Sequence, residues 1–212
     1  MSDLFIIGAG GTSREIIDVV ENINRDGHRW NICGILDDDP SKLGQTINDV
    51  PVIGPVSLST EKKGLFIIGI ASFKNRWVRK QIVERLALEP KRYASLIHPS
   101  AQVSRWSQIG SGTVIQRNVI VGPQVHIGNH VVVSSMTFIG HDTNIADFVT
   151  MAPQVCLSGS VQVGECAYLG AGARVRDSVT IGVGALVGIG SVVLSTVETS
   201  STVFGNPARR VQ

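Results

Sequence analysis

Apolar residues recur at every sixth position through the second half of the chain, without interruption. The series comprises Ile97, Val103, Ile109, Ile115, Val121, Ile127, Val133, Ile139, Ile145, Met151, Leu157, Val163, Leu169, Val175, Ile181, Val187 and Val193. The residue four places after each of them is small or β-branched, as at Ala101, Thr113 and Ala185. Residues two positions apart in a strand share one face, so each small residue and the next apolar one point inward together. Every group of six residues is therefore predicted to form one short strand and one corner.

Glycine often stands directly after the apolar residue, where a corner leaves little room for a side chain. It does so at Gly110, Gly122, Gly128, Gly140, Gly164, Gly170, Gly182 and Gly188. A constant period of six fits neither an amphipathic helix nor an antiparallel sheet with regular hairpins. Each buried aliphatic side chain contributes about 1.5–3 kcal/mol, so stacked repeats stabilise a coil that no single repeat forms alone. The pattern predicts a β-solenoid, which we assign to residues 93–212.

The first part of the chain shows a different pattern, in which short apolar runs alternate with amphipathic segments. Strands are expected at residues 4–7, 32–36 and 65–70, and helices directly after the first strand and near residues 75–88. Thr12 or Ser13 is expected to cap the first helix. Strands that alternate with helices predict a small parallel α/β sheet, which we assign to residues 1–92.

The carboxyl ends of these strands should meet at one edge of the sheet and form a crevice there. The glycine loop with Gly10 and Gly11, the acidic pair Asp37 and Asp38, and Gly69 all fall at that edge. Amides at the start of a helix hold phosphate, and a carboxylate accepts hydrogen bonds from a ribose. A nucleotide site is one interpretation. The other is that the glycines merely turn the chain, because serine replaces the third glycine of a dinucleotide-binding loop.

The composition narrows the possible functions. Hydrophobic residues make up 43% of the 212 residues and charged residues only 17%, with a net charge of +2. Without clustered Lys and Arg, nucleic acid is a poor partner. No apolar run is long enough to cross a membrane, and the chain lacks a basic secretory start, so a cytoplasmic protein without a membrane partner is expected. The three cysteines lack the spacing of a metal site, so no metal is expected.

The repeat of an apolar residue, Gly and a small residue resembles the hexapeptide-repeat acyltransferases over about residues 97–209. With the α/β domain before it, the resemblance narrows to the sialic acid type of sugar O-acyltransferases and to the N-acetyltransferases of nucleotide-linked 4-amino-4,6-dideoxy sugars. It implies a left-handed parallel β-helix with three repeats in each triangular coil. It also implies a homotrimer with active sites between subunits.

The resemblance further implies the two substrates. Family members bind a nucleotide-linked sugar through the residues that correspond to Gly10, Gly11, Thr12, Asp37, Asp38 and Gly69, and they use acetyl-CoA as the cosubstrate. Ala171 and Ile189 each lie between two glycines, which leaves their amides open to a pantetheine arm. The tail with Pro207 and Arg209 resembles the family's coenzyme A-binding end. The alternative for the glycines at these corners is simple turn geometry.

The chain also matches the family's active-site stretch, H-[DE]-x-x-I-x-[DE]-F-x-x-x-[AS], from His141 to Ala152. The match implies that His141 is the general base, beside Asp142, which favours the protonated imidazole. Gly159 lies one coil further, and in this family the amide there faces the acetyl carbonyl as an oxyanion donor. Thr150 stands where many relatives have a second histidine that contacts the acetyl donor, and by this resemblance we expect Thr150 to bind acetyl-CoA.

We therefore interpret the sequence as an acetyl-CoA-dependent N-acetyltransferase that acts on the 4-amino group of a nucleotide-linked amino-deoxy sugar, by direct attack in a ternary complex. The alternative in the same class is O-acetylation of a sugar hydroxyl, as on sialic acid. Two further hypotheses are a non-catalytic scaffold and a zinc-binding β-helix that uses His126, His130 and His141, whose spacing argues against it. The nucleotide, UDP, GDP, dTDP or CMP, is left open.

Overall fold

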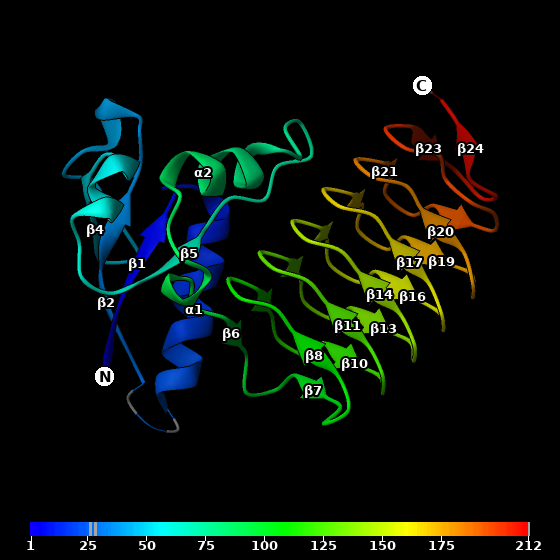
Figure 1. The fold of residues 1–212 in the computed structure, drawn as a ribbon, viewed down its shortest axis with the longest axis horizontal. Coiled ribbons are helices and arrows are strands. Elements are labelled where there is room, and N and C mark those ends of the chain that lie inside the picture. Colours follow the sequence, from blue (N-terminus) through cyan, green and yellow to red (C-terminus); the bar gives the residue numbers. More distant parts are fainter. Residues whose placement is uncertain (26, 28, 212) are drawn as a thin grey trace.

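The computed structural model describes residues 1–25, 27 and 29–211, and it consists of an α/β domain followed by a solenoid (Figure 1). The α/β domain contains a five-stranded sheet with the order β3-β4-β2-β1-β5. Its strands are β1 (Ser2–Ile7), β2 (Trp30–Leu36), β3 (Thr46–Ile47), β4 (Val50–Gly54) and β5 (Leu65–Ile68). Neighbouring strands run parallel except for β3, which pairs antiparallel with β4.

Two helices cover the two faces of this sheet. They are α1 (Gly11–Arg25) and α2 (Val78–Leu86), with short 3-10 helices at Pro40–Lys42, Val56–Thr60 and Pro90–Arg92. The apolar side chains of β1 alternate between the faces, as the strand period requires. Leu4 and Ile6 pack in the same cluster as the apolar face of α1. Phe5 and Ile7 pack with α2 on the other side, so the sheet is buried on both faces.

The start of the first helix differs from the sequence prediction. Helix α1 begins at Gly11, so neither Thr12 nor Ser13 caps it. The buried hydroxyl of Ser13 instead donates hydrogen bonds to the carbonyls of Gly8 and Gly69, and so ties the glycine loop to the end of β5. The cap prediction is wrong because the helix begins before Thr12. The hydroxyl of Ser13 is used for these tertiary hydrogen bonds, which the local sequence does not reveal.

The solenoid is a parallel β-helix with one sheet on each side of a triangular coil (Figure 1). We call the sheet β24-β23-β21-β18-β15-β12-β9-β6 face 1, the sheet β22-β19-β16-β13-β10-β7 face 2, and the sheet β20-β17-β14-β11-β8 face 3. Paired strands are 18 residues apart, since Val133 pairs with Met151 and Met151 pairs with Leu169. Each coil therefore contains three repeats, and the predicted fold class is confirmed.

The strands of the solenoid are short, and in most of them the second residue points into the coil. Face 1 contains β6 (Leu96–Ile97), β9 (Val114–Ile115), β12 (Val132–Val133), β15 (Thr150–Met151), β18 (Tyr168–Leu169), β21 (Leu186–Val187), β23 (Thr202–Phe204) and β24 (Arg209–Arg210). Face 2 contains β7 (Gln102–Val103), β10 (Ile120–Val121), β13 (Phe138–Ile139), β16 (Cys156–Leu157), β19 (Arg174–Val175) and β22 (Val192–Val193). Face 3 contains β8 (Gln108–Ile109), β11 (His126–Ile127), β14 (Asn144–Ile145), β17 (Gln162–Val163) and β20 (Thr180–Ile181).

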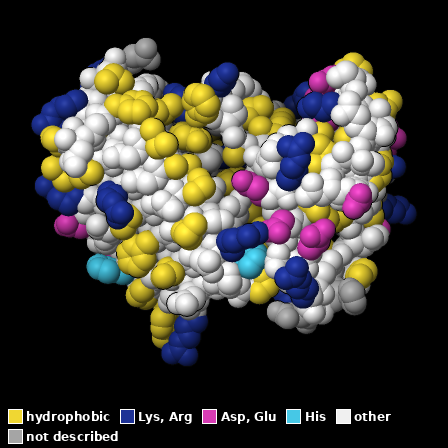
Figure 2. All heavy atoms as spheres, turned by 180° about the vertical axis from the view of Figure 1, so that it is seen from behind, with side chains coloured by type: hydrophobic (Ala, Val, Ile, Leu, Met, Phe, Trp, Pro, Cys, Tyr) yellow, Lys and Arg dark blue, Asp and Glu magenta, His cyan; other side chains and the backbone are white. Residues whose placement is uncertain are grey.

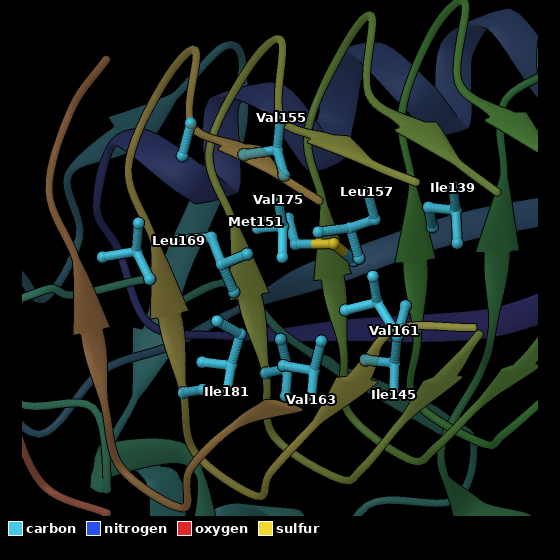
Figure 3. Packing of buried hydrophobic residues seen from close by; sticks show 14 of the residues in the cluster. Ile139, Ile145, Met151, Val155, Leu157, Val161, Val163, Leu169, Val175 and Ile181 are labelled. Atoms are coloured by element: carbon cyan, nitrogen blue, oxygen red, sulfur yellow. The ribbon is translucent and has the colours of Figure 1, made fainter. Parts of the chain in front are cut away.

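An apolar column fills the inside of the solenoid (Figure 3). Ile139, Ile145 and Met151, which come from three successive faces, are completely buried. The small positions of the repeat also point inward, as Val155 does. Ile97 departs from the predicted pattern because it is 39% exposed. Its strand β6 pairs with a neighbour on one side and lies at the end of face 1, where no further coil covers it.

The α/β domain packs on face 1 through a buried arginine of α2. Arg79 is 2% exposed, and its guanidinium donates to acceptors from both parts of the molecule. These are the carbonyls of Ile70, His130, Phe148 and Val149, and the hydroxyl of Thr150. Burial lowers the pKa of Arg79 to about 10, so the side chain stays a cation at neutral pH. Backbone carbonyl groups from both domains thus stabilise the buried positive charge of Arg79.

Polar pairs surround this contact. They are Lys80 with Glu165, Arg76 with the carbonyl of Gly184, Gln116 with Glu15, and Arg117 with Asp18. Away from the contact the solenoid carries few charges, and Figure 2 shows its surface as mostly uncharged with many hydrophobic side chains. Among the described residues, no helix is both long and apolar enough to span a bilayer.

His130 is buried beneath the α/β domain, with 5% of its surface exposed. Its ring stacks on Phe148 at 5.2 Å between centroids and meets the edge of Tyr93 at 4.5 Å. Burial, and after it the charge of Arg79, lowers the pKa of His130 to about 4, although Asp147 opposes the shift. His130 is therefore neutral in the folded protein at pH 7.

Acidification should destabilise the fold through His130. Between pH 6.5 and pH 4 the unfolded chain binds a proton that the folded His130 does not bind, so the free energy of unfolding falls as the pH falls. From pH 7 to pH 5 this loss should be roughly 2 kcal/mol. Urea unfolding followed by circular dichroism measures it.

Two variants separate His130 from other titrating groups. His130→Gln is neutral at every pH and should flatten this pH dependence. His126→Gln, on exposed face 3, should retain it. Equal pH dependence in all three proteins would contradict the assignment.

Candidate active site

A cleft of about 330 Å³ opens at the carboxyl ends of β1, β2 and β5. It is lined by residues 8–12, Asp37, Lys42 and residues 69–71. A Cβ built on Gly10 or Gly11 meets no atom within 4 Å, so the first amides of α1 border open space. Lys42 adds a positive charge beside them. Free amides at a helix start and a nearby cation suit an anion such as a diphosphate.

Asp37 shapes this cleft by holding the loops around it. One carboxylate oxygen accepts hydrogen bonds from the amide of Ala9 at 2.6 Å and from Lys42 at 2.9 Å, and the other accepts from the amide of Asp39 at 2.9 Å. Burial opposes ionisation, but these hydrogen bonds outweigh it and lower the pKa of the carboxyl group. The sequence predicted that Asp37 accepts hydrogen bonds from a nucleotide. In the structure its oxygens are already engaged by the chain.

A second cleft of about 320 Å³ adjoins the first and also contains Gly8 and Ile70. Its walls include the apolar side chains of Val56, Val78 and Ile82, and its polar groups include Asp38, Gln81 and Arg85. The carboxylate of Asp38 accepts from the amide of Val56 at 2.9 Å and from Arg85 at 2.8 Å. Apolar walls with polar groups beside them suit a flat heteroaromatic ring. Lys42 and Arg85 escaped the sequence analysis because neither belongs to a recognisable local motif.

His141 lies at the corner between β13 and β14, on the edge where faces 2 and 3 meet. Its Nδ1 is 2.7 Å from Oδ2 of Asp142. The two side chains are 64% and 57% exposed. The contact with Asp142 occupies Nδ1, so Nε2 is the ring nitrogen left for another molecule.

Gly159 occupies the equivalent corner one coil further along the same edge. A Cβ built there would lie 2.6 Å from Cε1 and 2.7 Å from Nε2 of His141, so any side chain would displace the imidazole. The amide of Ser160 donates to the carbonyl of His141 at 2.8 Å and holds the two corners together. The structure thus brings His141, Asp142 and Gly159 into one place.

An apolar groove of about 420 Å³ follows a different edge, between faces 1 and 2. Its lining from the solenoid is Ala152, Pro153, Tyr168, Gly170, Ala171, Leu186, Val187, Gly188, Ile189 and Phe204. Phe73, from the α/β domain, completes it. A Cβ built on Gly188 would lie 2.3 Å from the ring of Phe204, so glycine leaves room for that ring. Of the residues predicted to bind acetyl-CoA, Ala171 and Ile189 line this groove.

The other residues predicted to bind acetyl-CoA lie outside the groove lining. Thr150 is 6% exposed, and its hydroxyl accepts a hydrogen bond from Arg79 at 2.8 Å. The α/β domain therefore covers the side chain of Thr150, and its contact with the acetyl donor stays a prediction. Pro207 and Arg209 are exposed in the C-terminal hairpin, where Arg209 pairs with Phe204.

The histidines of the zinc hypothesis lie in three different surroundings. His126 is exposed on face 3, His130 is buried beneath the α/β domain, and His141 lies on the edge of faces 2 and 3. Within residues 1–25, 27 and 29–211, no three His, Cys, Asp or Glu side chains come together as metal ligands would. The described residues therefore give the zinc hypothesis no support.

Known proteins match the two parts of the chain. The family model described as the PglD N-terminal domain matches residues 3–86. A UDP-N-acetylbacillosamine N-acetyltransferase from Bacillus subtilis is 34% identical over 122 residues. That match covers 54% of this chain and 51% of the relative, so the chain spans about half the length of this curated relative.

Solved structures match over nearly the full chain. The acetyltransferase domain of PglB from Neisseria gonorrhoeae, in complex with acetyl coenzyme A, has a TM-score of 0.86 and 30% identity, and the match covers 99% of both chains. A perosamine N-acetyltransferase from Caulobacter crescentus, in complex with CoA and GDP-perosamine, has a TM-score of 0.85 and 27% identity over 100% of this chain and 98% of that one. The latter protein is a variant in which a histidine is replaced by asparagine.

Proposed function

The chain belongs to the hexapeptide-repeat sugar acetyltransferases, the family that includes the nucleotide-sugar N-acetyltransferases, and we propose that it transfers the acetyl group of acetyl-CoA to the 4-amino group of a nucleotide-linked amino-deoxy sugar. The observation that carries the proposal is the contact between His141, Asp142 and Gly159 at an exposed corner. It combines a base, a carboxylate that orients the base and a backbone amide.

The proposed reaction is a direct transfer in a ternary complex. Asp142 accepts a hydrogen bond from Nδ1 of His141, which leaves the lone pair of Nε2 free. The amine attacks the thioester carbonyl, Nε2 takes the proton of the amine, and the N–H of Gly159 stabilises the oxyanion. The C–S bond then breaks, and the coenzyme A thiolate takes the proton from the imidazolium. An amide and a thiol result, and His141 returns to its neutral form.

The clefts of the α/β domain support a nucleotide-linked acceptor. We assign nucleotide binding to residues 1–92, with the diphosphate at the amides of Gly10, Gly11 and Thr12 beside Lys42. The base then lies in the adjoining cleft, near Asp38. In this assignment Asp37 and Gly69 shape the loops rather than carry the specificity.

The apolar groove supports binding of a pantetheine arm. We assign acetyl transfer to residues 93–212, with the arm along the backbone of Ala171 and Ile189 and the nucleotide end of acetyl-CoA near Pro207 and Arg209. Arg209 has an exposed cationic side chain, which suits a phosphate.

The positions of these features support a trimer. The groove lies on the edge of faces 1 and 2, whereas His141 lies on the edge of faces 2 and 3. If three solenoids turn face 2 toward a common threefold axis, the first edge of one subunit meets the second edge of its neighbour. His141 of one chain then faces the groove of the next. We therefore propose a homotrimer with active sites between subunits.

The outward side chains of the three faces favour this arrangement. Face 1 is covered by the α/β domain, and face 3 presents the exposed polar residues Gln108, His126, Asn144, Gln162 and Thr180. Face 2 exposes Ile120 at 43% and Phe138 at 42%, in line with Cys156 and Val192, and the exposed Gln102 and Arg174 are the polar members of the same row. A mainly apolar row with one arginine is typical of the buried centre of a subunit interface, where other charged residues are depleted.

O-acetylation of a sugar hydroxyl is the alternative reaction at the same base. The anion cleft with Lys42 favours a nucleotide-linked acceptor over a free sugar such as sialic acid. The similar proteins from Bacillus subtilis and Caulobacter crescentus are N-acetyltransferases by name, which favours the amine. We also propose that the enzyme is cytoplasmic, as the sequence predicts.

Replacement of the base should abolish most turnover. His141→Ala should lower kcat by about 10²- to 10⁴-fold, because the amine loses its proton acceptor. Thiol release from acetyl-CoA measures turnover against a panel of UDP-, GDP-, dTDP- and CMP-linked amino sugars. His126→Ala, which removes an exposed histidine from face 3, should retain full activity. Unchanged turnover of His141→Ala would disprove the role of the base.

Gly159→Ala tests the position of the imidazole. The added Cβ would lie 2.6 Å from Cε1 of His141, so the ring must move. A displacement of this size should lower kcat by about 100-fold. Ser160→Ala adds no atom and should change kcat by less than about twofold. Equal activity of the two variants would contradict the geometry.

Phe138→Asp tests the trimer. A carboxylate in the apolar row of face 2 should separate the subunits, and the variant should elute as an inactive monomer when size-exclusion chromatography is coupled to light scattering. Asn144→Asp places the same charge on polar face 3 and should stay trimeric and active. A trimeric Phe138→Asp would show that face 2 is not the interface.

A further inference from the structure

One loop belongs to the walls of both proposed substrate sites. Residues 71–77 form most of the connection between β5, which ends at Ile68, and α2, which begins at Val78. Ala71, at the beginning of this loop, lines the cleft that contains the α1 amides. Phe73, two residues later, lines the apolar groove of the solenoid. The loop therefore spans the distance between the nucleotide cleft and the groove within a single chain.

The loop is attached at both ends. Before it, the carbonyl of Ile70 accepts a hydrogen bond from the buried Arg79 at 2.9 Å. At its other end, Nε of Arg76 donates to the carbonyl of Gly184 at 3.0 Å. The ring of Trp77 lies so close to Gly184 that a Cβ there would be 2.8 Å from it. The end of the loop is thus tied to the same solenoid that carries the groove.

Phe73, between these attachments, is an apolar side chain that the chain itself leaves uncovered. It is 53% exposed. Its ring centroid lies 6.2 Å from that of Tyr168, at an interplanar angle of 57°. An arm bound in the groove would cover both rings. Phe73 thus gains burial when the groove is filled, and its backbone position depends on a loop that begins in the nucleotide cleft.

This arrangement links the binding of the two ligands. A phosphate at the amides of the first cleft would contact the residues that lead into the loop, since Ala71 lines the same cleft, and would restrict them. A ligand in the groove would pack on Phe73 and hold the same loop against Tyr168. When the first ligand has already ordered the loop, the second loses less conformational entropy on binding. The coupling must be reciprocal, since it is one free energy shared by two sites.

We propose that Phe73 is an acetyl-CoA-binding residue supplied by the nucleotide-binding domain, and that residues 71–77 make each substrate tighten the binding of the other. The proposal rests on the proposed function, because it takes the groove as the pantetheine site. It adds a contact of Phe73 with acetyl-CoA and a coupling between the affinities of the two substrates. The reaction is thereby directed toward the complex that holds both substrates, which limits futile hydrolysis of the thioester.

Isothermal titration calorimetry of the full-length trimer tests the coupling. CoA is titrated into the protein alone and into the protein saturated with UDP or GDP, whichever binds. The Kd of CoA should fall by about fivefold or more when the nucleotide is present. The reverse titration of the nucleotide into CoA-saturated protein should give the same factor. A factor of one in both directions would overturn the coupling.

Two matched variants separate the loop from the groove. Phe73→Ala should weaken CoA binding several-fold and bring the coupling factor close to one. Phe204→Ala removes a comparable ring, 43% exposed, from the C-terminal hairpin at the same groove. It should weaken CoA binding while the coupling factor stays at its wild-type value. Phe73→Leu, which keeps an apolar side chain, should lie between wild type and Phe73→Ala in both quantities.

The outcomes separate the two proposals. If Phe73→Ala keeps the wild-type coupling factor and CoA affinity, the role of Phe73 is wrong. If the wild-type protein binds neither CoA nor any nucleotide, the proposed function itself fails. Circular dichroism and light scattering of each variant confirm that it is folded and trimeric before titration.

Discussion

The stacking of identical coils is the constraint on which the rest of the structure depends. Each inward side chain packs on the one 18 residues earlier, as Met151 packs on Val133. The strands of the two coils pair in parallel. Because burial requires this register, corners also stack at the same interval. His141 therefore meets Gly159, and Ala171 meets Ile189, on two straight edges. Packing inside the coil thus sets the geometry of the chemistry outside it.

The second constraint is the buried guanidinium between the domains. Within the part of the chain that the structure describes, no carboxylate accepts a hydrogen bond from Arg79, which is held by carbonyl oxygens from the α/β domain and from the solenoid. The planar fork of arginine supplies enough donors in fixed directions to satisfy such a ring of acceptors, which an ammonium does not. Separation of the domains would leave several of these groups unpaired. The two clefts of the α/β domain are thereby held at a constant position relative to face 1.

The α/β domain lies on face 1, and this limits which faces of the solenoid can contact another subunit. In the proposed trimer, face 2 with its exposed Ile120 and Phe138 is the surface for self-association, and face 3, with its polar row, remains toward solvent. The proposed base and the proposed pantetheine groove would then belong to different chains, so activity would depend on assembly. The loop with Ala71 and Phe73 connects the cleft at the start of α1 with the apolar groove within one chain.

The sequence by itself determined the solenoid. The resemblance to the hexapeptide-repeat family supplied the coil of three repeats, and with it the prediction that His141 lies beside Gly159. The physical reason is that a repeat of six residues is a local rule, and the steric demands of one coil apply to every other coil. Only the tertiary structure decided the contacts that have no period, such as Arg79 with Thr150 and Phe73 with Tyr168. These contacts join segments about 70 or more residues apart, and no spacing along the chain marks their partners. The burial of Thr150 is an example, because its place in the repeat is outward and another domain covers it.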